Sequence, residues 1–100
     1  MNVIDKNIER LKKLCSKHRV AKLYVFGSAI SDHFSKDSDI DFMVSFDNVD
    51  LNKYADNYFD FKFSLEELFN RDIDLLEEKA IKNPFFKQSI DNSKKIIYGY

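Results

Sequence analysis

The sequence predicts a small α/β (α+β) fold, a mixed β-sheet of about four strands with helices packed against it. A β-branched and aromatic run at residues 22–26 ends at a glycine, as a buried strand does at a turn. Residues 39–46 alternate polar and apolar side chains, which indicates a second strand. Residues 50–69 carry apolar side chains at steps of three and four, which indicates a long amphipathic helix. One hundred residues, 44% of them hydrophobic, fit one compact domain over 1–100.

The chain opens with a helix, expected at about residues 4–18. Its apolar side chains recur at helical spacing: Ile4, Ile8, Leu11, Leu14 and Cys15. Cys15 cannot form an internal disulfide, since it is the only cysteine, and we expect it to pack in or beside the core. His18 ends the helix, where a cation suits the helix dipole, and we expect it at the surface.

The first strand leads into Gly27 and Ser28, and ten residues separate Ser28 from Asp39. Side chains of a strand alternate between its faces, so Asp39 and Asp41 should share one face of the second strand. Adjacent carboxylates repel each other, and a cation between them relieves the repulsion. Oxygen ligands favour Mg²⁺ or Mn²⁺. A simpler interpretation is that the two acids only protect an edge strand from aggregation.

A turn at a strand end that opens a helix presents unpaired backbone N–H groups, which bind phosphate. We expect residues 28–35 to form such a turn or short helix, facing the phosphates of a nucleotide. A phosphate-binding turn next to metal-binding carboxylates indicates a nucleoside triphosphate site.

The helix over 50–69 has a continuous apolar stripe: Leu51, Tyr54, Tyr58, Phe61, Leu65 and Leu68. Phe59, Phe63 and Phe69 lie outside that stripe, so the helix is apolar over much of its circumference. Two interpretations stay open. The extra aromatic residues belong to a wide core stripe, or they form a face that binds a partner.

Residues 71–76 predict a third strand, with Ile73 and Leu75 inward and Asp72 and Asp74 on the opposite face. A short helix is expected near residues 77–82. Asn83 and Pro84 form an N-cap and N1 pair that opens a helix through about Asp91. Residues 96–98 predict the last strand.

These residues resemble the DNA polymerase β-like nucleotidyltransferases, and among them the minimal nucleotidyltransferases. The motif of that family is Gly-Ser, about ten residues, then Asp-x-Asp, and Gly27, Ser28, Asp39 and Asp41 match it. The resemblance implies that Gly27 and Ser28 bind the nucleotide phosphates and that Asp39 and Asp41 hold two metal ions, Mg²⁺ or Mn²⁺. The family has a third carboxylate on a neighbouring strand.

Asp74, in an Ile-Asp-Leu context, best matches that third catalytic and metal-binding carboxylate, and Asp72 is the second choice. The sequence departs from the family after Gly-Ser. Many relatives have an arginine and, three positions later, a glycine, where this chain has Ala29 and Asp32. Lys36 is a candidate substitute cation.

The resemblance implies transfer of a nucleoside monophosphate to a hydroxyl. Minimal members are commonly antitoxins paired with a small helical HEPN-type toxin, and for such pairs it implies transfer of AMP from ATP to a tyrosine of the toxin. The alternative is a non-catalytic module that neutralises its partner by contact. Ala29, in place of the arginine, favours that alternative.

Charge and hydropathy exclude other classes. The chain has no apolar run long enough for a membrane span and no signal peptide at its start, so a cytoplasmic protein is expected. Residues 1–22 carry a net charge of +5 and residues 23–78 a net charge of −10. Basic helix faces are usually only solvated, so nucleic acid is not expected as a partner. A homo-oligomer is compatible with the sequence.

Overall fold

The computed structural model describes residues 2–27 and 39–99 and contains one four-stranded sheet. Its strands are β1 (Val20–Phe26), β2 (Ile40–Phe46), β3 (Ile73–Glu77) and β4 (Lys95–Tyr98). The order across the sheet is β3-β2-β1-β4, in which β1 pairs antiparallel with both β2 and β4, and β2 pairs parallel with β3. The predicted mixed α/β sheet is therefore confirmed.

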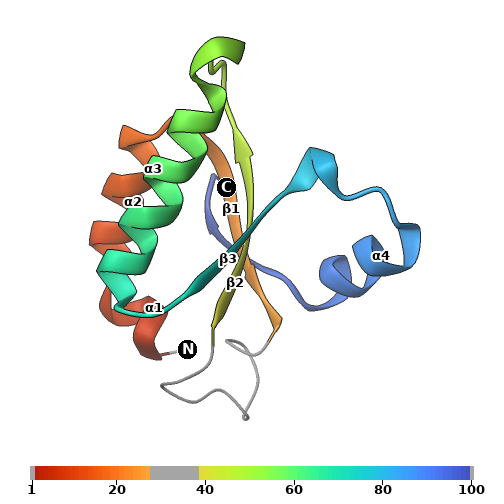
Figure 1. Cartoon of the computed structure of the whole chain (residues 1–100). Coiled ribbons are helices and arrows are strands. Elements are labelled where there is room, and N and C mark those ends of the chain that lie inside the picture. The colour runs from red at the N-terminus through yellow and green to blue at the C-terminus, as the bar shows by residue number, and fades with distance from the viewer. Residues whose placement is uncertain (1, 28–38, 100) are drawn as a thin grey trace.

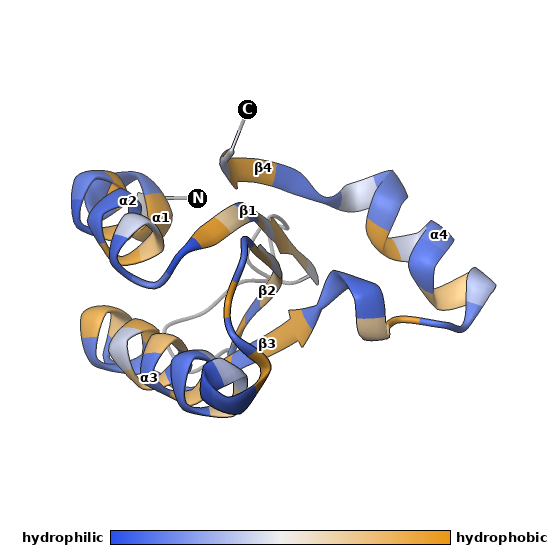
Figure 2. Ribbon diagram, turned by 90° about the horizontal axis from the view of Figure 1, so that it is seen from above, coloured by the Kyte–Doolittle hydropathy of each residue, from blue (hydrophilic) through white to orange (hydrophobic). Residues whose placement is uncertain are grey.

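Three helices cover one face of the sheet: α1 (Asn2–Lys6), α2 (Ile8–Lys17) and α3 (Leu51–Phe69) (Figures 1 and 2). The main core lies between these helices and the strands, and it includes Leu11 of α2, Phe42 of β2 and Phe61 of α3, each fully buried. Apolar side chains from both layers exclude water here, which is the main stabilisation of a domain of this size.

Helix α4 (Pro84–Ser93), preceded by the 3₁₀ turn η2 (Glu78–Ala80), lies on the opposite face of the sheet. A second and smaller core of Phe26, Met43 and Ile90 connects this helix to the sheet. The cap predicted at Asn83 is confirmed, since its side-chain oxygen accepts hydrogen bonds from the backbone N–H groups of Phe85 (2.9 Å) and Phe86 (3.2 Å).

Two expectations about the N-terminal segment were wrong. The single helix expected over 4–18 is divided at Asn7, whose side chain donates a hydrogen bond to the carbonyl of Val3 (2.9 Å). Asparagine competes in this way with the helical backbone bonds. His18, expected at the surface, is buried because it continues the inward face of α2. Its Nδ1 donates to the carbonyl of Leu14 (2.9 Å), and its ring packs 5.4 Å from that of Phe61.

The aromatic residues of α3 divide between core and surface. Phe69, outside the expected stripe, is buried and packs against Phe42 with ring centroids 5.9 Å apart. Phe59 and Phe63 are 49% and 57% exposed and stack on each other at 6.0 Å. Leu51, expected in the stripe, is 92% exposed, in the first turn of α3, which extends past α2 (Figure 1).

The packing role expected for Cys15 leads to a test of thiol reactivity. Cys15 is fully buried, and burial raises the pKa of its thiol to about 12. Because the thiolate is the reactive species, native protein at pH 8 should resist an aromatic disulfide reagent and should react completely in denaturant. Rapid labelling of native protein would contradict the buried position.

Candidate functional site

The strand register brings the predicted acidic residues together. Phe26, the last residue of β1, is the partner of Asp41 near the start of β2, and Asp41 is in turn the partner of Asp74 in β3. Directly opposed residues on parallel neighbours place their side chains on the same face. Asp41 and Asp74 therefore lie next to each other at the end of the sheet where β1 leads into Gly27.

Gly27 leaves the space that the carboxylate of Asp41 occupies. Its φ is +72°, a backbone conformation that side-chain-bearing residues rarely adopt. A Cβ at this position would collide with Oδ2 of Asp41. The turn after β1 thus requires glycine for two independent reasons, conformation and close approach of the acid.

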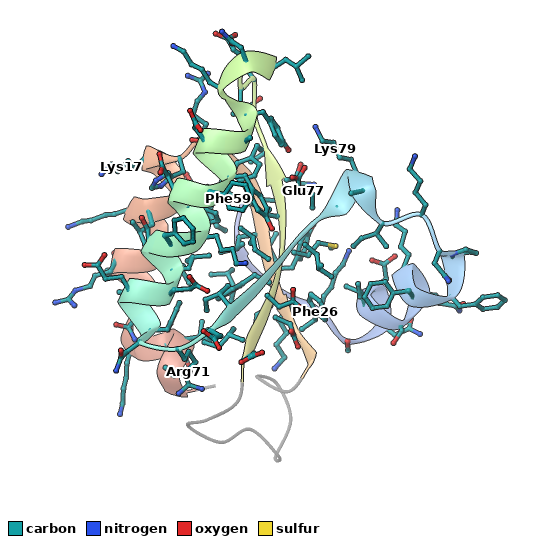
Figure 3. The ribbon with its side chains drawn as sticks, in the orientation of Figure 1. Lys17, Phe26, Phe59, Arg71, Glu77 and Lys79 are labelled. Atoms are coloured by element: carbon teal, nitrogen blue, oxygen red, sulfur yellow. The ribbon has the colours of Figure 1, made fainter. Side chains whose placement is uncertain are left out.

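The pair lies on the α4 face of the sheet, together with the side chains of Phe26 and Met43. Both of these apolar residues are buried in the smaller core, while Asp41 is half-buried and Asp74 is exposed. Figure 3 shows Phe26 at the end of β1, on the side of the sheet that carries α4. The carboxylates consequently have the buried side chains of Phe26 and Met43 on one side and solvent on the other.

The electrostatics of the pair favour a cation. Burial, the negative charges of Asp74 and Asp39, and a hydrogen bond with Asp74 together raise the pKa of Asp41 above its ordinary value. Burial is the largest of these causes. Since the ionised form is destabilised by a like charge and by lost hydration, a divalent cation bound here would lower the free energy of the site.

The register also distinguishes the two candidates for the third carboxylate. Asp74 lies opposite Asp41 and contributes to its pKa shift. Asp72 precedes β3 and is exposed, and its backbone carbonyl accepts a hydrogen bond from the N–H of Ile40 (3.3 Å). The geometry therefore supports Asp74 as the partner of Asp41.

Several predicted features lie outside the described residues. Ser28, Ala29, Asp32, Lys36 and the helix or turn expected over 28–35 all fall there. Asp39, just before β2, is described and exposed. In residues 2–27 and 39–99, no three His, Cys, Asp or Glu side chains converge as a metal cluster. A carboxylate pair nevertheless fits Mg²⁺, which proteins usually hold through one or two carboxylates plus substrate phosphates.

Sequence reasoning did not identify the smaller core of Phe26, Met43 and Ile90 on the face of the sheet that carries the carboxylates. A signal was present in the sequence, because Met43 follows Asp41 by two residues and so shares its face, and an apolar residue on that face needs a cover. Nothing local indicated that α4, through Ile90, supplies the cover.

Solved structures share the small mixed sheet and its flanking helices. A structure described as a minimal nucleotidyltransferase superposes with a TM-score of 0.77 at 22% identity, covering 94% of this chain and 92% of that one. A toxin–antitoxin complex with AMP-PNP gives 0.72 at 22% identity, with coverages of 94% and 74%. A tri-AMPylated HEPN toxin of Shewanella oneidensis in complex with an MNT antitoxin gives 0.66 at 20% identity, with coverages of 96% and 72%.

Sequence comparison determines the family. The polymerase beta nucleotidyltransferase model matches residues 9–100. Two proteins of Methanocaldococcus jannaschii that are named as protein adenylyltransferases are 34% and 35% identical to the chain, each over 87% of this chain and 84% of the relative. The chain belongs to the polymerase beta nucleotidyltransferase family, and its activity is nucleotidyl transfer.

The raised pKa of Asp41 leads to a stability test. An acid whose pKa is higher in the folded state loses stability as pH rises from its unfolded pKa through its folded pKa. At pH 7 with a chelator present, Asp41→Asn should therefore melt a few degrees higher than the parent protein. The control is Asp60→Asn, an exposed acid of α3, which should melt like the parent. A lower melting temperature for Asp41→Asn would contradict the strained carboxylate pair.

Proposed function

We propose that this protein transfers AMP from ATP to a tyrosine hydroxyl of a HEPN-type toxin and is the antitoxin of a toxin–antitoxin pair. The observation that carries the proposal is the Asp41–Asp74 pair beside Gly27. Supporting it are the relatives named as protein adenylyltransferases and the neighbours in which an MNT antitoxin accompanies an AMPylated HEPN toxin.

Asp39, Asp41 and Asp74 would hold two Mg²⁺ or Mn²⁺ ions, consistent with their oxygen donors and with the raised pKa of Asp41. When bound, such ions neutralise the triphosphate and stabilise charge that develops as the phosphoryl group is transferred. A bound divalent cation would offset the repulsion between the two adjacent carboxylates, and this is the electrostatic reason for a metal at the site.

The residues of the chain orient the substrates and move one proton. Gly27 and Ser28, which match the Gly-Ser of the family motif, would bind the phosphates. Asp74, the more exposed acid of the pair, faces the acceptor and takes its proton. The tyrosine oxygen then forms a bond to the α-phosphorus, the bond from that phosphorus to the oxygen bridging the α- and β-phosphates breaks, and pyrophosphate leaves. Proximity of the two reactants contributes much of the rate.

The second candidate function is neutralisation of the partner by contact alone. Ala29 stands where many relatives have an arginine, which weakens the case for tight triphosphate binding. The carboxylate pair is compatible with either function and so does not distinguish them. A nucleotide covalently attached to the partner does.

A transfer assay tests the proposal. The partner incubated with this protein, ATP and Mg²⁺ should gain a label from ATP α-phosphate that persists after denaturation, because the new bond is covalent. Asp39→Asn/Asp41→Asn should bind the partner but leave it unlabelled. If that variant protects cells from the partner at substoichiometric amounts as well as the parent does, the contact mechanism replaces the enzymatic one.

The choice of third carboxylate has its own test. Asp74→Asn should lower the transfer rate at least a hundredfold, since it removes both a metal ligand and the proton acceptor. Asp72→Asn is the matched control and should retain most of the activity, because Asp72 lies outside the Asp41 pairing. Single-turnover rates measured at saturating ATP would decide. The reverse ranking would show that Asp72 is the ligand.

A further inference from the structure

Helix α4 is poorly covered by the rest of the chain. Of its residues only Ile90 is buried, while Phe85 is 82% exposed and Phe86 is 46% exposed. Figures 1 and 2 show α4 standing away from the sheet, on the side opposite α1, α2 and α3. Exposed apolar side chains that lie together, unlike scattered single ones, mark surfaces that other proteins cover.

The two ends of α4 differ in how they are attached. At the C-terminal end, Ile90 packs with Phe26 and Met43, and Lys94 places its Nζ 4.4 Å from the ring centroid of Tyr24. Lys94 also forms an ion pair with Asp91 at 2.8 Å. The N-terminal end, which carries Phe85 and Phe86, has no comparable anchor among the described residues. Residues 82–95, called the arm below, are thus attached to the sheet through the C-terminal end of α4, and the exposed phenylalanines lie at the end without such contacts.

This arm lies on the face of the sheet that carries Asp41 and Asp74. Phe26, which packs with Ile90, is the strand partner of Asp41, so the base of α4 adjoins the carboxylate pair. Another exposed aromatic pair among the described residues, Phe59 and Phe63 on α3, belongs to the helical layer on the opposite face of the sheet. A protein seated on α3 would be separated from the carboxylates by the sheet.

The arm is also basic. Residues 82–95 contain four lysines and one aspartate, a net charge of +3. Lys82 and Lys87 flank the phenylalanines in sequence, and both are exposed. By contrast, Asp56 and Asp60 flank Phe59 on α3. Complementary charge selects partners and speeds their encounter, so the arm favours an acidic surface with an apolar centre.

We propose that the N-terminal half of α4, with Phe85 and Phe86 at its centre and Lys82 and Lys87 around them, is the docking surface for the acceptor protein. The inference rests on the proposed function, since it identifies the element that presents the acceptor to Asp41 and Asp74. The occupant is an acidic, partly apolar segment of the toxin-type partner, close to the hydroxyl that receives the nucleotide. A protein docked there reaches the carboxylates along one face of the sheet.

Binding and transfer are measured separately to test this surface. The probe is a purified HEPN-type toxin, the partner that the proposed function assigns to this chain. Phe85→Ala/Phe86→Ala is compared with the matched pair Phe59→Ala/Phe63→Ala. Buried aromatic anchors dominate interfaces, so the first variant should weaken binding to the probe at least tenfold and reduce transfer in parallel, while ATP binding measured by calorimetry stays unchanged. The second variant should bind and transfer like the parent.

Charge reversal provides the second arm of the test. Lys82→Glu/Lys87→Glu should weaken binding at least tenfold in low salt, and the difference should narrow at high salt because ions screen the attraction. If the α3 variant loses binding and the α4 variants do not, the docking surface is on α3 and this inference is wrong, whereas the proposed function stands. If the parent binds the probe through Phe85 and Phe86 without labelling it, the docking surface stands and the transfer proposal fails.

Discussion

Repulsion between two carboxylates is the constraint on which the site depends. The parallel pairing of β2 with β3 sets Asp41 opposite Asp74, and the turn at Gly27 has room for the acid only because it lacks a side chain. A fold that buries a carboxylate and places like charges beside it loses stability, and the pKa of Asp41, raised first by burial and then by the charges of Asp74 and Asp39, reflects that loss. Such local cost is typical of functional sites, where charge is arranged for a ligand rather than for the folded chain alone.

The two faces of the sheet have different tasks. The face under α1, α2 and α3 carries the main core, with Phe42, Phe61 and Leu65 fully buried, and so holds the strands in register. Among the described residues, the other face carries Asp41, Asp74 and the smaller cluster around Ile90. Most of the buried apolar side chains thus lie on the face away from the acids. No helix in residues 2–27 and 39–99 is long and apolar enough to cross a membrane.

Local patterns predicted most of the fold. The alternation of polar and apolar side chains predicted β2 and placed Asp41 on the same face as Asp39. The Asn83-Pro84 pair predicted the start of α4. The errors arose where distant residues decide burial. His18 was assigned to the surface from its place at a helix end, but the ring of Phe61, more than forty residues later, covers it. The helical pattern left Phe69 open between the core and a partner-binding face, and its contact with Phe42 places it in the core.

The candidate site was predictable in part for the same reason. Sequence alone put Asp39 and Asp41 on one face and preferred Asp74 to Asp72, but the position of Asp74 opposite Asp41 follows from the β2–β3 register, a long-range property. Spacing could not reveal that Ile90 packs with Phe26, the strand neighbour of Asp41, or that α4 leaves two phenylalanines exposed. These features depend on how much of the sheet α4 covers, which is a tertiary property that a local sequence pattern does not predict.

The most direct measurement is the position of bound metal. Crystals grown with Mn²⁺ and a non-hydrolysable ATP analogue, recorded at the manganese absorption edge, should show anomalous density between the carboxylates of Asp41 and Asp74, in contact with phosphate oxygens. Crystals of Asp39→Asn/Asp41→Asn, grown in the same way, should lack it. Anomalous density elsewhere, or nucleotide bound identically in both proteins without metal at the pair, would contradict the account.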